Sequence, residues 1–233
     1  MSKERPPFSA IAEQYPEGSF SLLGSKTLVA SDNPLASEIA ASHERIINKT
    51  AENLQLEHEL THSSMIPELY NKRGFLQAAE KTLSDYKGFA AMVYFDANKF
   101  KQINDTYGHD VGDSVIKEIG KAILSTSRRM TTEAAQYGSK DILSHQSGDE
   151  FCALLMPRGE SVYDKDQAQL AAEKYLLRLR EVLANVHIDD LHFDLSLSAG
   201  VVIVDKTQDN LVDVLSVINE ADKLMLASKA NRK

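Results

Sequence analysis

A strongly apolar run ends in a single acid, and an acidic pair on a small turn follows further along the chain. The run Phe89–Phe95 predicts a strand with Asp96 at its tip. In Ser147–Phe151 a small turn precedes two adjacent acids, Asp149 and Glu150, with an apolar residue directly behind them. Adjacent carboxylates repel each other, so such a pair needs a cation, a strong donor or full solvation. If strand tip and turn face each other, three carboxylates gather in a group suited to divalent cations and phosphate chemistry.

Mg²⁺ fits this group because one or two carboxylates hold it, while waters and substrate phosphates complete its shell. An isolated Asp-Glu pair, however, is more often a solvated hairpin tip than a metal site. The residues between the two acidic segments decide between these interpretations.

The stretch that follows Asp96 supplies side chains suited to a nucleotide. Phe100 and Ile103 recur at helical spacing on one face, which leaves Lys101, Asn104 and Asp105 free to face a cleft. The Asn104 amide can pair with a ring acceptor of guanine, and the Asp113 carboxylate can accept from the ring N–H and the exocyclic amine. Lys101 can hold phosphates as a point charge. Each residue alone predicts only a helix cap or an exposed side chain, but their combination indicates a nucleotide site.

In these motifs the sequence resembles the GGDEF family, the diguanylate cyclases. Asp96–Asp113 is similar to the signature D-x-D-x-F-K-x-I-N-D-x-Y-G-H-x-x-G-D, with Asn98 in place of the second acid. Ser147–Phe151 resembles the motif that names the family, with serine at the first glycine. Leu195–Val201 resembles a later S-x-G strand, and Ala221–Lys229 resembles the closing A-D-x-x-x-Y-x-A-K helix, with Leu226 at the aromatic position. The resemblance runs from about Ser64 to the last residue.

The resemblance implies an α+β, palm-like fold, in which a central, mainly antiparallel sheet is flanked by helices, as in nucleotidyl cyclases and polymerases. An N-terminal helical extension would precede it, with residues 1–62 as leader and helix and residues 63–233 as the catalytic domain. Periodicity and turn residues predict helices over about 35–61, 73–86, from 100, 112–127, 167–184 and 211–230, a strand ending at 96, a hairpin over 142–155 and a strand over 193–204.

The resemblance also implies the chemistry: two GTP molecules condense to cyclic di-GMP with release of two pyrophosphates. Each domain binds one GTP, so a homodimer is expected to act. The expected catalytic residues are Asp149, Glu150 and Asp96, and the expected ligands of Mg²⁺, with Mn²⁺ as the alternative, are Asp96, Ala97 through its carbonyl, Asp149 and Glu150. The expected substrate-binding residues are Phe100, Lys101, Asn104, His109, Asp113, Ser147, Gly148 and Lys229.

Several positions depart from the family pattern. Ser64–Arg73 stands where the entry motif D-x-L-T-G-L-x-N-R-R is usual and lacks its Asp, Thr and Gly, and His145 stands where an arginine usually precedes the acidic motif. Serine at position 147 would cost about 1 kcal/mol if that position needs a positive φ. The inhibitory R-x-x-D motif keeps Asp141 but has Gly138 at the arginine position, so feedback through that site is expected to be absent.

Composition excludes several classes of protein. The 233 residues, 42% of them hydrophobic, can bury one ordinary core plus an extension. A formal charge of −8 argues against a nucleic acid partner. Cys152, the single cysteine, excludes an internal disulfide and is expected to be a small core residue. The sequence has no signal-peptide core and no apolar run long enough to span a bilayer, so a cytoplasmic protein is expected.

The N-terminal region leaves two interpretations open. Residues 1 to about 34 are rich in proline and glycine, and the helical pattern that follows places Ile39, Ile46 and Leu60 on one seam, whereas the other seam is mostly polar. Either a single packed helix or a dimerising stalk fits, and the segment is also where a regulatory protein partner would act.

Three functions compete. An active diguanylate cyclase is favoured because the metal acids and both base-reading positions are present. A catalytically silent domain that binds GTP or cyclic di-GMP and signals through protein contacts is the alternative, supported by the altered entry motif. A palm-type enzyme for another nucleotide is the third, and Asp113 argues against it.

Overall fold

The computed structural model describes residues 34–127, 141–157, 161–188, 194–208 and 211–230, with side chains from residue 41 onward. The expected leader and Gly138 lie outside the described residues. The chain divides into two compact units, Met1–Glu57 and His58–Lys233.

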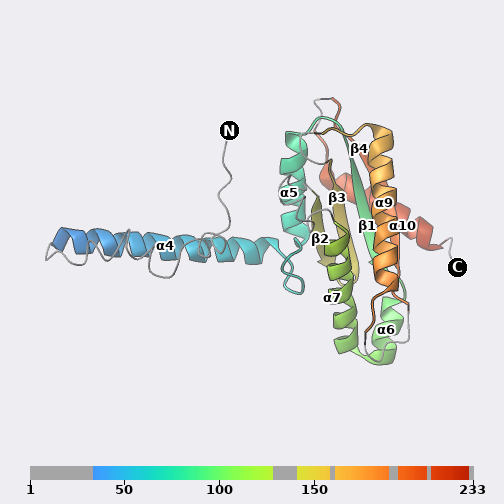
Figure 1. Ribbon diagram of the computed structural model, residues 1–233, viewed down its shortest axis with the longest axis horizontal. Coiled ribbons are helices and arrows are strands. Elements are labelled where there is room, and N and C mark those ends of the chain that lie inside the picture. Colours follow the sequence, from blue (N-terminus) through green and yellow to red (C-terminus); the bar gives the residue numbers. More distant parts are fainter. Residues whose placement is uncertain (1–33, 128–140, 158–160, 189–193, 209–210, 231–233) are drawn as a thin grey trace. The chain divides into compact units, whose positions relative to one another are not determined.

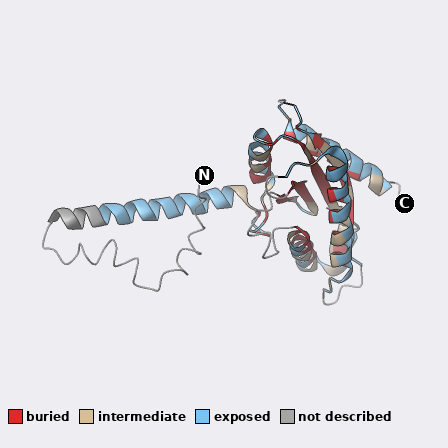
Figure 2. Ribbon diagram, turned by 45° about the horizontal axis from the view of Figure 1, so that its top comes forward, coloured by how far each residue is buried: buried red, intermediate tan, exposed pale blue. Residues whose placement is uncertain are grey.

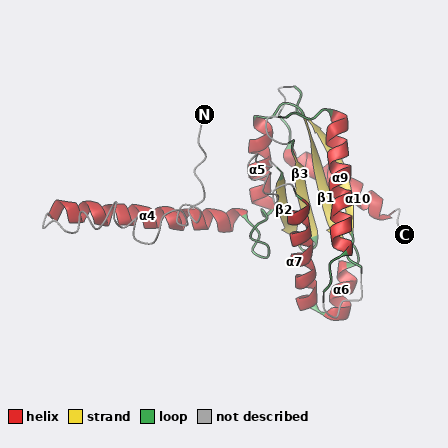
Figure 3. Ribbon diagram, in the orientation of Figure 1, coloured by secondary structure: helices red, strands yellow, loops and turns green. Residues whose placement is uncertain are grey.

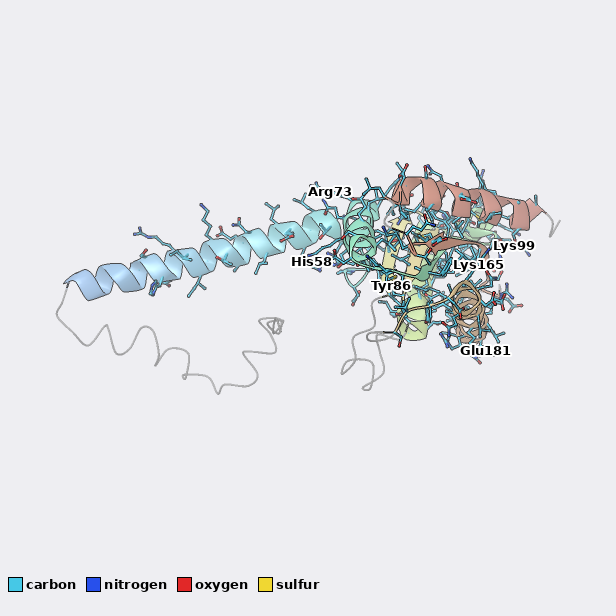
Figure 4. All side chains as sticks on the ribbon, turned by 90° about the horizontal axis from the view of Figure 1, so that it is seen from above. His58, Arg73, Tyr86, Lys99, Lys165 and Glu181 are labelled. Atoms are coloured by element: carbon cyan, nitrogen blue, oxygen red, sulfur yellow. The ribbon has the colours of Figure 1, made fainter. Side chains whose placement is uncertain are left out.

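Helix α4 (Pro34–Thr61) makes up the described part of the first unit and enters the second with its last turn. Every side chain from residue 41 to 60 is exposed, including the apolar side chains of Ile46, Ile47, Leu54, Leu56 and Leu60. In Figure 4 side chains project from α4 on all sides. A packed helix buries an apolar stripe, and residues 41–60 of α4 by themselves bury none.

Asn71 ties the last turn of α4 to the next helix, α5 (Lys72–Ser84). Its side-chain amide donates to the carbonyl oxygens of Leu60 at 3.0 Å and His62 at 3.1 Å, and its Oδ1 accepts from Gly74 N at 2.9 Å. One side chain therefore satisfies a terminal carbonyl of α4 and one directly after the helix, and it caps the N-terminus of α5.

The second unit is built on a four-stranded antiparallel sheet in the order β2-β3-β1-β4 (Figures 1 and 3). The strands are β1 (Phe89–Ala97), β2 (Ile142–Ser147), β3 (Glu150–Leu155) and β4 (Leu197–Asp205). The apolar run of β1 is buried because it pairs with β3 on one side and β4 on the other.

Helices cover both faces of this sheet. Side chains alternate along β1: Val93 and Phe95 pack with α7 (His109–Thr126) and α9 (Lys165–Ala184), whereas Met92 and Tyr94 pack with α5 and α10 (Val214–Ala230). Figure 2 shows buried residues concentrated in the strands and on the inward sides of the helices. The expected α+β architecture, a central antiparallel sheet flanked by helices, is confirmed.

Most element boundaries agree with the sequence patterns, and three differ. Helix α7 begins at His109 rather than at residue 112, directly after α6 (Phe100–Tyr107) and Gly108. Strand β4 begins at Leu197 rather than at residue 193, and α10 begins at Val214 rather than at residue 211. For β4 and α10, apolar residues before the element extended the sequence pattern, because apolar periodicity does not report where backbone pairing starts. For α7 the apolar stripe begins only after the first turn, so the start was expected too late.

Gly200 allows α10 to lie directly against β4. A Cβ at this position would stand 2.0 Å from the carbonyl oxygen of Ala221 and 2.4 Å from Met225 N, both in the α10 backbone. The residue at the centre of the S-x-G strand is therefore glycine because the helix backbone occupies the space of a side chain.

We expect Gly200→Ala to lower the free energy of unfolding by about 1–3 kcal/mol, because the added methyl forces α10 away from the sheet. Gly148→Ala is the matched control: Gly148 has φ 53° but open space around its Cβ position, so only a backbone cost of about 1 kcal/mol applies. Urea unfolding of both variants measures the difference, and an equal loss would contradict the close approach of α10.

Candidate active site

The acidic edge of the sheet is set by strand register. Asp96 lies opposite Glu150 on β3 and opposite Ser198 on β4, at the ends of the paired segments. The backbone N–H of Ala97 donates to the carbonyl oxygen of Asp149 at 3.1 Å, which ties the turn between β2 and β3 to the tip of β1. The two acidic segments expected to meet therefore do meet.

The turn itself relies on glycine at one position only. Gly148 has φ 53°. Among the described non-glycine residues only Lys99 has a positive φ, so Ser147 does not need one. The backbone cost considered for serine at position 147 therefore does not arise. The Ser147 hydroxyl instead donates to Glu150 Oε2 at 3.2 Å, so this substitution adds a contact to one of the acids.

Lys229 reaches the same edge from α10. Its ammonium group forms an ion pair with the Asp96 carboxylate, although the two residues are 133 positions apart. The expectation for Lys229 was a contact with substrate phosphates; in this structure the side chain lies at the site and faces the acid.

The expected base-reading residues lie on α6 and α7. Asn104 is partly buried, and a Cβ on Gly112 would stand 1.8 Å from its Oδ1, so glycine at 112 leaves the space that the amide occupies. That Oδ1 is one of three buried side-chain polar atoms without a hydrogen-bond partner among the described residues. Asp113 follows Gly112 in the first turns of α7 and is exposed.

The other expected substrate residues are on the surface of the same helices. Lys101 and His109 are exposed, Phe100 is partly buried against the core, and Ser147 and Gly148 are exposed on the turn. Lys99, labelled in Figure 4, precedes α6 with φ 59°, a left-handed conformation that costs a non-glycine residue about 1 kcal/mol or more.

A family model described as the diguanylate cyclase GGDEF domain matches residues 61–233. The chain belongs to the GGDEF family. It is 31% identical over 141 residues to diguanylate cyclase A of Treponema denticola, a match that covers 60% of this chain and 33% of that protein. The chain therefore spans about a third of that relative's length.

Solved structures share the fold. The coiled coil and GGDEF domain of DgcB from Caulobacter crescentus, solved with c-di-GMP, has a TM-score of 0.64 at 17% identity and covers 85% of this chain and 96% of its own. Diguanylate cyclase SiaD of Pseudomonas aeruginosa, solved with its activator SiaC, has a TM-score of 0.58 at 23% identity and covers 96% of this chain and 77% of its own. None of the described helices is long and apolar enough to cross a membrane.

Asn98, which replaces the second acid of the GGDEF signature, holds a loop together. Its Nδ2 donates to Ser196 Oγ at 3.0 Å, its Oδ1 accepts from Ser198 Oγ at 2.6 Å, and its backbone N–H donates to the Ser196 carbonyl. The segment after β1 is thereby fixed to the start of β4, and this work needs an amide rather than a carboxylate because both a donor and an acceptor are used.

Asp141, the acid of the inhibitory motif, is buried in this GGDEF domain and bonded internally. Its Oδ1 accepts from Met156 N at 2.9 Å, and Ser127 Oγ lies 3.5 Å from Oδ2. These contacts hold the start of β2 beside the end of β3.

Negative charge accumulates around Asp149. Burial raises the pKa of Asp149 above its ordinary value, the carboxylates of Asp96 and Glu150 raise it further, and the Lys229 ammonium acts in the opposite direction. Burial also raises the pKa of the Tyr94 phenol, which bonds with the Glu150 carboxylate. Sequence reasoning missed Tyr94, although a residue two positions before Asp96 shares its face of the strand.

The donor atoms at this edge fit a hard cation. Carboxylates and a backbone carbonyl are the oxygen ligands that Mg²⁺ prefers. Among the described residues, however, no three His, Cys, Asp or Glu side chains are arranged to hold a metal ion. The ion pair between Lys229 and Asp96 accounts for part of this, since the ammonium occupies a carboxylate oxygen that a cation would need.

Two cavities in the described part of the domain lie away from this edge. One of about 460 Å³ lies by the first residues of β1 and the start of α9, lined in part by Gly88, Phe89 and Tyr163. Another of about 350 Å³ is lined by Arg180, Leu183, Leu195, Ser196 and Leu197. Neither is lined by an expected site residue, so the chemistry of the side chains identifies the site.

We expect the pKa of Asp149 to fall in Asp96→Asn and to rise in Lys229→Met, because the first change removes a repelling charge and the second an attracting one. Carboxyl ¹³C NMR titration of the labelled protein measures both. Asp85→Asn, an exposed change at the end of α5, is the control and should leave the value unchanged. If the pKa of Asp149 is the same in both variants as in the unchanged protein, Asp96 and Lys229 do not affect this carboxyl.

Proposed function

We propose that this chain is a diguanylate cyclase that condenses two GTP molecules into cyclic di-GMP and two pyrophosphates, acting as a homodimer with Mg²⁺. The register that sets Asp96 opposite Glu150, with Asp149 bonded to the same strand tip, carries the proposal. Membership of the GGDEF family and the named relatives support it.

The chain's own residues would divide the work at the sheet edge. Asp96, Glu150, Asp149 and the Ala97 carbonyl would hold the cation, whose charge, when it is bound, favours ionisation of the ribose 3′-hydroxyl and stabilises the phosphates. Lys229 would exchange its bond with Asp96 for the substrate phosphates, and Lys101 would add a second positive charge.

Guanine would be held at the contact between α6 and α7. The Oδ1 of Asn104 is buried against Gly112, so the amide would meet a ring acceptor of the base through its Nδ2, and Asp113 can accept from the Watson–Crick edge. Phe100 and His109 would line the base, and Ser147 and Gly148 the phosphates.

The alternative is a catalytically silent GGDEF domain that binds GTP or cyclic di-GMP and signals through protein contacts. Two observations favour it: the described residues hold no ready group of three metal ligands, and Lys229 neutralises Asp96. Product formation distinguishes the two functions.

We expect purified protein with GTP and Mg²⁺ to form cyclic di-GMP, identified by mass. Glu150→Gln should lower the rate by at least about 100-fold, because a neutral amide binds a cation weakly. Loss of a residue that only orients a metal ligand costs up to about 100-fold, and loss of a ligand itself should cost at least as much. Glu80→Gln, an exposed change on α5, is the matched control for an acid-to-amide change and should retain activity. A folded Glu150→Gln protein with substantial synthesis would remove Glu150 from the metal site.

The chemistry and α4 both support the proposed dimer. A 3′-hydroxyl on one subunit must lie in line with the α-phosphate held by its partner, so a lone domain can bind GTP without reacting. The exposed apolar side chains of Ile46, Leu54 and Leu60 give α4 a surface that a second copy can cover. A regulatory protein acting on this segment would then control activity; the SiaD structure contains an activator of that enzyme.

We expect the Ile46→Asp variant to have lower specific activity at low protein concentration, because the charge weakens pairing of α4 and dilution separates the subunits. Its specific activity should recover at high protein concentration. Asn48→Asp introduces the same charge off the expected seam and is the control. Specific activity across a hundredfold dilution, with sedimentation at each concentration, measures both. Identical dilution curves for the two variants would mean that α4 does not hold the dimer.

A further inference from the structure

Ser63 and His145 connect the segment after α4 to the acidic turn. The Ser63 hydroxyl oxygen lies 2.9 Å from His145 Nδ1, and His145 Nε2 lies 2.9 Å from the carbonyl oxygen of Gly148. The imidazole is 8% exposed and packs on Phe151, with ring centroids 5.0 Å apart. Both ring nitrogens are therefore engaged inside the domain.

These contacts assign the ring's protons. A carbonyl oxygen can only accept, so Nε2 carries the hydrogen that bonds Gly148. Ser63 Oγ already accepts from Met65 N at 3.3 Å and Ile66 N at 3.2 Å, which leaves its own hydrogen for Nδ1. His145 is then a neutral imidazole protonated at Nε2.

The turn needs such a tether. Strand pairing shifts register between His145 and Ser147, so the regular ladder is interrupted just before the turn. Gly148 has no side chain, and no described atom outside its chain neighbours lies within 4 Å of its Cβ position. Side-chain packing therefore does not hold the tip at Gly148, and the bond from His145 fixes a carbonyl directly before Asp149.

The far end of the tether is itself held. The backbone N–H of His145 donates to the Tyr70 carbonyl at 2.9 Å, and Tyr70 N donates to the Leu143 carbonyl at 3.0 Å. The segment that contains Ser63 and Tyr70 is thus bonded to β2 at two levels, through backbone and through the imidazole.

We propose that His145 is a positioning residue that holds the turn bearing Asp149 and Glu150, and that Ser63 selects the tautomer that allows it. The kinetic consequence rests on the proposed function, whereas the tautomer and the cation affinity do not.

Imidazole NMR tests the tautomer in the full-length protein. The imidazole signals of His145 are assigned as those that are missing from the spectrum of His145→Gln. Long-range ¹H–¹⁵N correlations should show that this ring is protonated at Nε2 and unprotonated at Nδ1. Ser63→Ala removes one of the two bonds that favour the Nε2–H tautomer and should raise the fraction of the Nδ1–H form, whereas Ser64→Ala, an exposed neighbour, should not. An Nδ1–H tautomer in the unchanged protein would overturn the proposal.

A pair of variants at position 145 tests the positioning. Gln can place an amide N–H near the site of Nε2, whereas Asn is too short to reach Gly148. We expect His145→Asn to lower kcat by about 10–100-fold, which is the range for loss of a group that orients metal ligands. The KM for GTP should stay within about twofold of the unchanged protein's value, and His145→Gln should restore most of the rate. Equal kcat in both variants and the unchanged protein would refute the role.

Mn²⁺ affinity, measured as free ion by electron paramagnetic resonance, separates the two hypotheses. If the unchanged protein forms no cyclic di-GMP, the proposed function fails, but His145→Asn should still bind Mn²⁺ about 10–100-fold more weakly than His145→Gln. If His145→Asn does not fold, Ser63→Ala replaces it. Unchanged Mn²⁺ affinity in a folded Ser63→Ala or His145→Asn protein would overturn the proposal.

Discussion

The antiparallel pairing of β1 with both of its neighbours is the constraint on which the rest of the domain depends. Register in such a sheet is all or none, because a slip by one residue moves every side chain to the opposite face. The alternating packing of Val93 and Tyr94 against different helix layers fixes that register. Asp96 can then only stand opposite Glu150 and beside the helix that carries Lys229.

The same pairing explains why the two faces of the domain differ in chemistry. Side chains of β1 that share a face with Asp96 point toward α10, and Gly200 lets the backbone of that helix approach the sheet. Lys229 extends from this helix to the acidic edge, so packing in the core determines whether a cation side chain reaches the carboxylates. A methyl group at Gly200 would act on the site through this path although it touches no site residue.

Much of the arrangement could be predicted from sequence, for physical reasons that can be named. The apolar run before Asp96 and the turn before Asp149 and Glu150 are local patterns, and strand pairing converts them directly into proximity. The contacts of Lys229 with Asp96 and of Ser63 with His145 are different, since they join residues 133 and 82 positions apart. No local period encodes such pairs. The start of α7 at His109 was also missed, because the apolar stripe of that helix begins only after its first turn.

The departures from the family pattern carry information about whether the site is maintained. Asn98 bonds to Ser196 and Ser198, Ser147 bonds to Glu150, and His145 bonds to Gly148. A site that had lost its function would accumulate changes without regard to their neighbours, and unpartnered polar groups would collect around them, because nothing would select against their cost. Around the acidic edge the opposite holds: each substituted side chain has a partner with suitable donor and acceptor chemistry. Among the described residues the buried Oδ1 of Asn104 lacks a partner, but Asn104 is not a substituted position. This pattern of satisfied substitutions favours a working cyclase over a silent domain.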